Sequence, residues 1–149
     1  MAKKKRIRPL ALCVFRRGDK IFVAEGHDKK INKTFYRPIG GGIDFTERAI
    51  ETVRREVREE IEADVTNLVY LGTLENIFSY EGQFGHEICL MFDGDFVDDF
   101  RNVDDYTVVG HDDGDVLFTA MWKSLDFFRN GHAPLYPDGL LALLEQYDD

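Results

Sequence analysis

Residues 41–63 contain an ordered set of side chains whose types and spacing suit chemistry on a metal ion. The set is Gly41, Glu47, Arg55, Glu56, Glu59 and Glu60. At about 100° per residue, the three glutamates that end the set fall on one stripe of a helix. Like charges at this spacing destabilise a helix by roughly a few tenths of a kcal/mol per pair, so solubility alone does not explain them. Hard carboxylate oxygens suit Mg²⁺ or Mn²⁺, and the stripe therefore predicts a divalent-cation site.

The helix that must position these carboxylates is predicted over residues 47–61. Its core-facing stripe consists of Ile50, Val53, Val57 and Ile61. Asp44 and Glu47 have the spacing of a capping box that would fix the start of the helix. The glycine cluster at 40–42 predicts a tight turn or loop that lets backbone groups approach a metal ion or phosphate.

The whole pattern resembles the Nudix box, the signature of the Nudix hydrolase family. The matching residues are Gly41, Glu47, Arg55, Glu56, Val57, Glu59 and Glu60. Two positions depart from the signature, because Glu62 replaces its glycine and Ala63 replaces a larger aliphatic residue. The glycine normally ends the helix in a left-handed conformation, so Glu62 implies either backbone strain or an extra helical turn. The Arg58–Glu62 spacing favours a helix that continues through Glu62.

The resemblance implies an α/β fold, a Nudix-type α/β/α sandwich with a central mixed sheet, in a single domain over residues 1–149. It also implies a divalent-metal-dependent hydrolase that cleaves a phosphoanhydride bond in a nucleoside diphosphate linked to another moiety. The implied metal ligands are Glu56, Glu59, Glu60 and the backbone carbonyl of Gly41, with Mg²⁺ or Mn²⁺ as the cofactor. Arg55 would orient the neighbouring carboxylates, and Arg55, Glu56 and Glu59 are the expected catalytic residues. Which glutamate would serve as the general base is left open.

Members of this family often recruit another acidic residue from a later strand or loop. The candidates in this chain are Glu87, Asp112 and Asp113. Arg37, immediately before Pro38, is a candidate contact for a substrate phosphate, and Glu87 is a second candidate for substrate binding. Each of these side chains can equally be an ordinary surface residue.

The same residues have other interpretations. Arg55 could pair with Glu51 on the helix surface, and the glutamates could form a solvated charge run. The glycine, Glu47 and Arg55 in register favour the functional interpretation. A catalytically inactive Nudix-like domain that binds a nucleotide or a protein is the alternative function, although such a domain should have lost box carboxylates. Calcium binding by the aspartates between positions 93 and 115 lacks the EF-hand spacing.

Composition limits the class of partner. A chain of 149 residues with 44% hydrophobic residues can form one substantial core. Its 19 basic and 28 acidic residues give a formal charge of −9, which makes nucleic acid an unlikely partner and a small nucleotide-type molecule the expected one. The basic run at residues 3–6 is interpreted as a solvated terminus, with a tether for an anionic ligand as the alternative. Association as a homodimer is left open.

The sequence shows neither a secretory signal nor an apolar stretch long enough to span a bilayer, so we expect a cytoplasmic protein that does not bind membranes. Cys13 and Cys89 lie in apolar runs and are expected to be small buried hydrophobes. They have no metal-ligand spacing.

Strands are predicted at 8–15, 21–25, 34–39, 69–78, 87–96 and 116–122. The polar, aspartate-rich stretch at 98–115 is interpreted as a connection between strands. Ser124 is predicted to cap a short helix that ends at Asn130 and Gly131, and Pro137 to open a final amphipathic helix through Gln146.

Overall fold

An uninterrupted apolar run at residues 10–15 forms the centre of the fold. All of these residues are buried, so the strand that contains them is covered on both faces. A continuous apolar run is typical of a central strand, whereas a strand with one solvated face alternates in polarity. The computed structural model describes residues 5–147 and places this strand in an eight-stranded sheet.

The strands are β1 (Ile7–Arg17), β2 (Lys20–Asp28), β3 (Lys33–Arg37), β4 (Ile39–Gly42), β5 (Val65–Tyr80), β6 (Gln83–Phe96), β7 (Thr107–His111) and β8 (Leu117–Ser124). The helices are α1 (Ala49–Ile61), α2 (Leu125–Arg129) and α3 (Leu140–Glu145), with a short 3-10 turn η1 (Asp99–Arg101). No helix within residues 5–147 is long and apolar enough to cross a bilayer.

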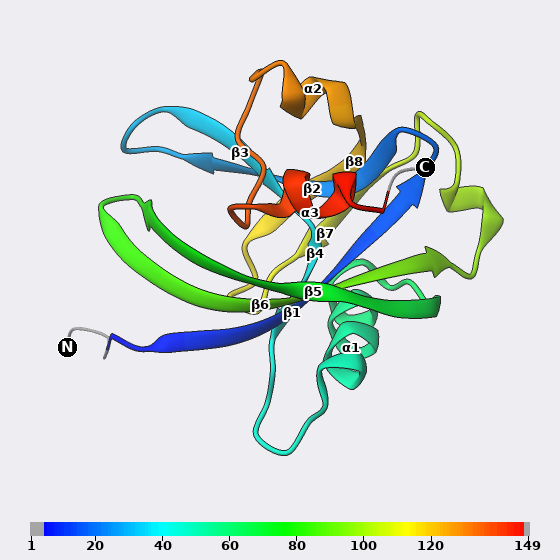
Figure 1. The fold of residues 1–149 in the computed structure, drawn as a ribbon, viewed down its shortest axis with the longest axis horizontal. Coiled ribbons are helices and arrows are strands. Elements are labelled where there is room, and N and C mark those ends of the chain that lie inside the picture. Colours follow the sequence, from blue (N-terminus) through cyan, green and yellow to red (C-terminus); the bar gives the residue numbers. More distant parts are fainter. Residues whose placement is uncertain (1–4, 148–149) are drawn as a thin grey trace.

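The sheet is mixed. Its order is β5-β6-β1-β2-β8-β7, with β3 paired to β2 and β4 paired to β1. The β1–β6 pair is parallel, and the other pairs are antiparallel. Helix α1 lies on one side of the sheet, and α2 and α3 lie on the other (Figure 1). The expected α/β/α arrangement around a central mixed sheet is therefore confirmed.

Each face of the sheet has its own hydrophobic core. Val53, Val57 and Ile61 of α1 pack with Ala11 and Cys13 of β1. On the opposite face, Leu10, Leu12 and Val14 of β1 pack with residues of α2 and α3. Alternate side chains of one strand therefore hold the two helical layers in fixed positions. Both cysteines are buried and free, as expected.

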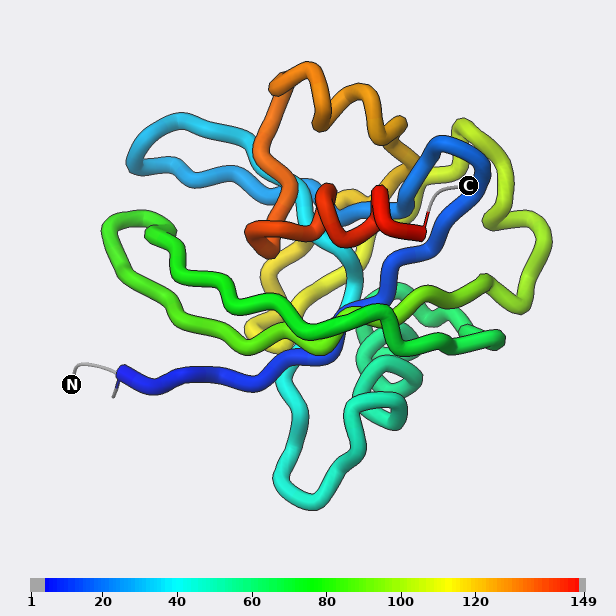
Figure 2. The backbone as a smooth tube through the Cα atoms, viewed as in Figure 1, coloured from blue at the N-terminus to red at the C-terminus, as the bar shows by residue number. Residues whose placement is uncertain are grey.

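Two long hairpins, β2–β3 and β5–β6, project from the same side of the molecule (Figure 2). Residues near their tips are in contact. The β5–β6 turn donates a hydrogen bond from the Glu81 amide to the Asp28 carboxylate of the β2–β3 hairpin, at 3.0 Å. The rings of Phe35 and Tyr80 meet edge to face with centroids 5.8 Å apart. The Glu81 amide bond, with other backbone bonds, lowers the pKa of Asp28, so this contact is made by the ionised form of its carboxylate.

Outside α1, the main differences from the sequence predictions concern three elements. Strand β4 includes Gly40, Gly41 and Gly42, where a loop was expected. Pairing with β1 uses only backbone groups, which glycine also has. The stretch at 98–115 contains the strand β7, whose largely exposed side chains conceal its apolar pattern. Helix α3 begins at Leu140, after a left-handed Gly139, and is shorter than predicted.

The start of α1 lies two residues beyond the predicted start. Arg48 is the N-cap residue, and its backbone amide donates to the Glu51 carboxylate at 2.9 Å. The predicted capping box at Asp44 and Glu47 was therefore misplaced, although the Asp44 amide does donate to Glu47 at 3.2 Å. Ile50, expected in the core, lies in the first turn of the helix and is exposed.

The predicted continuation of α1 through Glu62 was wrong. The helix ends at Ile61, and Glu62 has φ 55° and ψ 36°, the left-handed conformation. Arg58 forms an ion pair with Asp64 and not with Glu62. Ala63 is buried, so the chain must turn back to the core directly after the helix.

Arg101 holds this helix exit from outside the helix. Its Nη2 donates to the Glu62 carbonyl at 3.2 Å, and its Nη1 donates to the Tyr106 hydroxyl at 2.6 Å. The guanidinium is buried, and it also lies 4.7 Å from the centroid of the Phe100 ring. Tertiary contacts therefore maintain a backbone conformation that glutamate by itself disfavours.

We expect Glu62→Gly to stabilise the protein by roughly 0.5–1 kcal/mol. Relief of left-handed strain is worth about 1–2 kcal/mol, and the greater freedom of glycine in the unfolded chain offsets about 0.4–1 kcal/mol of it. Urea unfolding gives the free-energy difference. Glu62→Ala is the control, because alanine removes the same side chain and retains the strain. If Glu62→Gly were no more stable than Glu62→Ala, the relief of strain would not exceed the entropic cost of glycine, which would contradict the prediction.

Candidate active site

Three carboxylates converge beside α1. One oxygen each from Glu56, Glu59 and Asp113 lies within 4.8 Å of the others. Glu56 and Glu59 come from the helix, and Asp113 comes from the loop between β7 and β8. Glu56 is 1% exposed, and its Oε2 has no hydrogen-bond partner among the described residues. A buried, unpartnered carboxylate oxygen next to two further carboxylates fits a hard divalent cation.

Gly41 provides the space that the Glu56 side chain occupies. A Cβ atom at position 41 would lie 2.6 Å from Glu56 Cδ and 2.7 Å from its Oε2, closer than real atoms approach. Strand β4 places Gly41 opposite Ala11 of β1, so the position cannot move away from the helix without breaking the sheet. Because Gly41 has no side chain, the Glu56 carboxylate can lie directly against its backbone.

Arg55 connects the carboxylates. Its Nε and Nη2 each donate to one oxygen of Glu47 at 2.8 Å, a bidentate contact. Its Nη1 donates to Glu56 Oε1 at 2.8 Å and to Glu59 Oε2 at 3.3 Å. Nη2 also donates to the Gly42 carbonyl at 3.1 Å. Since Oε1 of Glu56 is held by Arg55, Oε2 is the oxygen left without a hydrogen bond from the described residues.

The electrostatics of these groups follow from burial and from Arg55. Hydrogen bonds from Arg55 and Thr52 lower the pKa of Glu47 to about 2. The hydrogen bonds and ion pairs with Glu47 and Glu56 raise the pKa of Arg55. Burial raises the pKa of Glu56, against the opposing effect of Arg55 and with repulsion from Asp113 and Glu59. The site therefore combines one buried carboxylate, Glu56, with two exposed ones, Glu59 and Asp113.

Glu60 was expected among the metal ligands, but it is not a member of the converging trio. Its carboxylate accepts a hydrogen bond from the Gly40 amide at 3.3 Å and is buried. Burial raises the pKa of Glu60 to about 8, although Arg37 and the Gly40 amide oppose the shift. Without a cation, this carboxyl is therefore largely protonated at neutral pH.

Arg37 and Glu87 lie close enough to influence each other. Burial raises the pKa of Glu87, and the charge of Arg37 is the largest opposing effect. A hydrogen bond from Asn76 also stabilises the Glu87 carboxylate. Asn76 is itself buried, and its Oδ1 accepts a bond from the Asp138 amide at 3.0 Å. The charge of Arg37 therefore acts on both Glu60 and Glu87, two acids outside the trio.

Asp112 and Asp113 have different positions in the β7–β8 loop. Asp112 Oδ1 accepts hydrogen bonds from the Gly114 and Val116 amides, both at 2.9 Å, and so holds the loop in shape. Asp113 is left exposed to face Glu56 and Glu59. The sequence pointed to both residues but could not separate their structural roles.

Two residues near the site were missed by sequence reasoning. Thr52 is buried in α1, and its hydroxyl donates to Glu47 Oε1 at 2.6 Å. Arg8 lines a cleft of about 350 Å³ that also includes Arg6, Arg55, Glu56 and Asp113. A threonine on the apolar side of a helix was the available signal for Thr52. A single arginine at the start of a strand gave no comparable signal.

Comparison with known proteins identifies the family. The model of the NUDIX domain matches residues 5–138. The chain belongs to the Nudix family. A Nudix protein of this kind is a pyrophosphohydrolase, an enzyme that acts on acid anhydrides. Comparison with curated proteins finds no match in sequence.

Solved Nudix structures share the fold at low sequence identity. A NUDIX hydrolase from Nitrosomonas europaea superposes with a TM-score of 0.64 at 21% identity, over 95% of this chain and 88% of the other. A NUDIX-family hydrolase from Clostridium perfringens gives 0.61 at 16%, over 95% and 98%. A MutT NUDIX hydrolase from Burkholderia pseudomallei gives 0.58 at 17%, over 97% and 100%. These likenesses establish the common architecture.

Replacing Gly41 with alanine should disrupt the site more than the fold. The new Cβ would displace the Glu56 carboxylate, and a displacement of about 1 Å near reacting groups costs roughly a hundredfold in rate. The overpacking should cost about 1–3 kcal/mol of stability. Steady-state kinetics and thermal unfolding measure the two effects. Gly114→Ala is the matched control, because its Cβ would lie 3.5 Å from Asp112 Oδ1, an ordinary contact. Equal activities of the two variants would contradict the steric role of Gly41.

The Glu47–Arg55 pair should give stability a characteristic acid dependence. The folded pKa of Glu47, about 2, lies below its ordinary value of 4.5, so its contribution is complete above pH 4.5 and is lost as the pH falls towards 2. We expect Glu47→Gln to be less stable than the wild type at pH 7, with the gap closing between pH 4.5 and 2. Melting temperatures at pH 7, 4 and 2.5 test this.

Glu145→Gln is the control for that series, since Glu145 forms an exposed pair with Arg129 and should contribute little at any pH. A difference between the wild type and Glu47→Gln that stayed constant down to pH 2.5 would refute the coupling.

Proposed function

We propose that this Nudix protein is a divalent-cation-dependent hydrolase that cleaves a phosphoanhydride bond in a nucleoside diphosphate linked to another group. The observation that carries the proposal is the unpartnered oxygen of buried Glu56 beside Glu59 and Asp113. Burying a carboxylate oxygen without a partner is unfavourable. A cation bound by the three carboxylates is the explanation that best fits this unpartnered oxygen.

The residues that would hold Mg²⁺ or Mn²⁺ are Glu56, Glu59 and Asp113. The Gly41 carbonyl and Glu60 are further candidates in the same part of the site. When bound, such a cation screens the negative charge of the phosphates and stabilises the charge that develops as the anhydride breaks. Binding would also favour the ionised form of Glu60, whose pKa of about 8 reflects its burial without a cation.

The protein groups supply positioning and proton transfer. A water oxygen forms a new bond to phosphorus, the bridging P–O bond breaks, and a carboxylate accepts the proton of the water. Glu56 and Glu59 are the candidates for that base. Glu59 has a side chain 51% exposed and is reachable by solvent, whereas Glu56 is fixed by Arg55. Arg37 and Glu87 are proposed to contact the substrate beyond the reacting phosphates.

A substrate panel tests the proposal directly. Nucleotide sugars, dinucleotides, nucleoside triphosphates and coenzyme A derivatives should be assayed with Mg²⁺, with Mn²⁺ and with a chelator. We expect turnover of at least one class that requires the cation. Nucleotide binding without any turnover would favour the inactive binding domain instead.

Glu59→Gln should lose most of the activity on whichever substrate is turned over. Removing one negative charge beside Glu56 and Asp113 also relieves repulsion between carboxylates, so the stability of the protein should be unchanged or slightly higher. Turnover rates and melting temperatures, measured with and without Mg²⁺, provide the comparison. Glu62→Gln removes the same charge at an exposed position just after the helix and should retain activity. Wild-type rates in Glu59→Gln would exclude Glu59 from both the metal site and the chemistry.

A further inference from the structure

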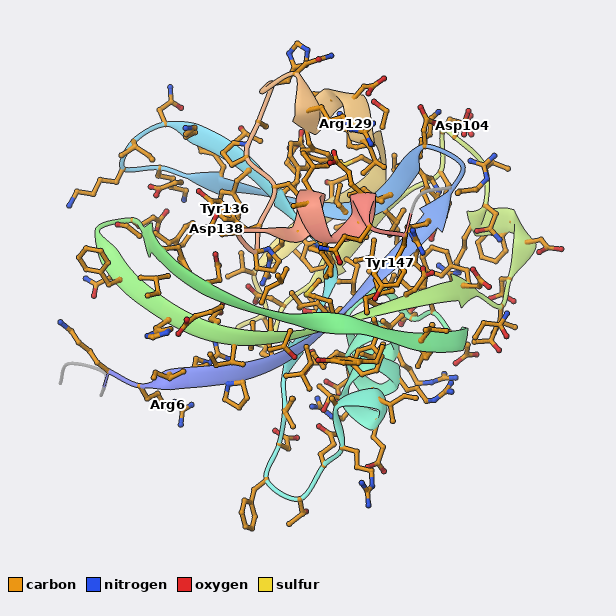
Figure 3. The ribbon with its side chains drawn as sticks, viewed as in Figure 1. Arg6, Asp104, Arg129, Tyr136, Asp138 and Tyr147 are labelled. Carbon is orange, nitrogen blue, oxygen red and sulfur yellow. The ribbon has the colours of Figure 1, made fainter. Side chains whose placement is uncertain are left out.

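The cleft beside the carboxylate trio has a cationic wall. Its lining includes Arg6, just before β1, and Arg8 in β1, together with Arg55 and the acids Asp44, Glu56 and Asp113. Figure 3 shows Arg6 next to the first residues of β1. Lys3 and Lys4 of the basic run lie outside the described residues, whereas Arg6 does border this cleft.

Arg8 is held loosely enough to accept a ligand. Its side chain is 49% exposed, and its Nη1 lies 4.0 Å from Glu87 Oε2, at the outer limit of an ion pair. Its Nη2 lies 3.3 Å from the place where a Cβ of Gly42 would stand. The guanidinium therefore lies beside Gly42 of β4, in the cleft that Glu56 and Asp113 also line.

Charge makes this wall unusual for the chain. The formal charge is −9, and the site itself concentrates carboxylates. A cation at the trio can neutralise one part of a polyphosphate, but an additional phosphate would meet a repulsive protein without a second positive group. Two guanidinium groups, whose planar forks match phosphate oxygens, supply that group.

Size favours a phosphate chain as the occupant. A cleft of about 350 Å³ lies at the lower end of the range for small-molecule sites, roughly 300–1,000 Å³. This volume suits several linked phosphates, with the nucleoside extending out of the cleft.

We propose that Arg6 and Arg8 form a subsite for an ionised phosphate beyond the scissile anhydride. The preferred substrates are then nucleoside triphosphates, in which the group linked to the nucleoside diphosphate is itself a phosphate. This inference rests on the proposed hydrolase function and specifies its substrate class.

The test compares ATP with ADP-glucose, which share a nucleoside diphosphate and differ in the charge of the attached group. In the double variant Arg6→Gln, Arg8→Gln, we expect KM for ATP to rise about tenfold, the effect of losing a charge-assisted contact. KM for ADP-glucose and both kcat values should change less than about twofold. Arg8→Lys should retain part of the ATP preference, because it keeps the charge but not the fork.

Arg17→Gln is the matched control. Arg17 lies at the opposite end of β1 and pairs with Asp104 at 2.5 Å, and Figure 3 shows Asp104 on the far side of the molecule from Arg6. This variant should leave KM for both substrates unchanged. Melting temperatures verify that every variant is folded. Equal changes of KM for ATP and ADP-glucose, or no change for either, would overturn the subsite.

Calorimetry separates this inference from the hydrolase proposal. With Mg²⁺ present, the wild type should bind inorganic tripolyphosphate about tenfold more tightly than pyrophosphate, and the double variant should lose that preference. If the wild type hydrolyses no member of the substrate panel, the proposed function fails while the binding preference still decides on the subsite. Equal affinity of the wild type for the two inorganic anions would overturn the subsite, whatever the turnover.

Discussion

The burial of Glu56 is the constraint on which the rest of the site depends. A carboxylate that is 1% exposed loses nearly all of its hydration, and the surrounding structure has to compensate for that loss. Arg55 compensates one oxygen and leaves the other without a partner. Gly41 is required because the carboxylate occupies the space of its missing side chain. Arg55 needs its own support, which Glu47 gives through a bidentate contact and Thr52 reinforces.

The sequence was sufficient where function depends on local spacing. The positions of Glu56 and Glu59 on one helix follow from the helical repeat, and the sheet and its flanking helices follow from apolar runs and turns. The burial of both cysteines followed in the same way. These features involve residues close in sequence, for which a helical or strand period determines direction.

The remaining features depend on contacts between distant segments. Asp113 reaches the trio through the β7–β8 loop, and no spacing in the sequence relates that loop to α1. The left-handed end of α1 depends on the burial of Ala63 and on the bond from Arg101 to the Glu62 carbonyl, whereas the Arg58–Glu62 spacing indicated only a local charge pair. Glu60 shares the stripe of the other glutamates, yet the neighbouring glycine strand directs it to the Gly40 amide.

Strand β7 occupies the edge of the sheet, with β8 as its hydrogen-bonded neighbour in the sheet order. Its Gly110 packs against the last turn of α1, and its end leads into the loop that carries Asp113. Edge strands open more easily than central ones, so the amide hydrogens of β7 should exchange with solvent before those of β1. The acidic cluster can then lose one member through local opening while both hydrophobic cores remain folded. Activity would then be lost at a lower temperature than the global fold, at the temperature where the edge strand β7 opens.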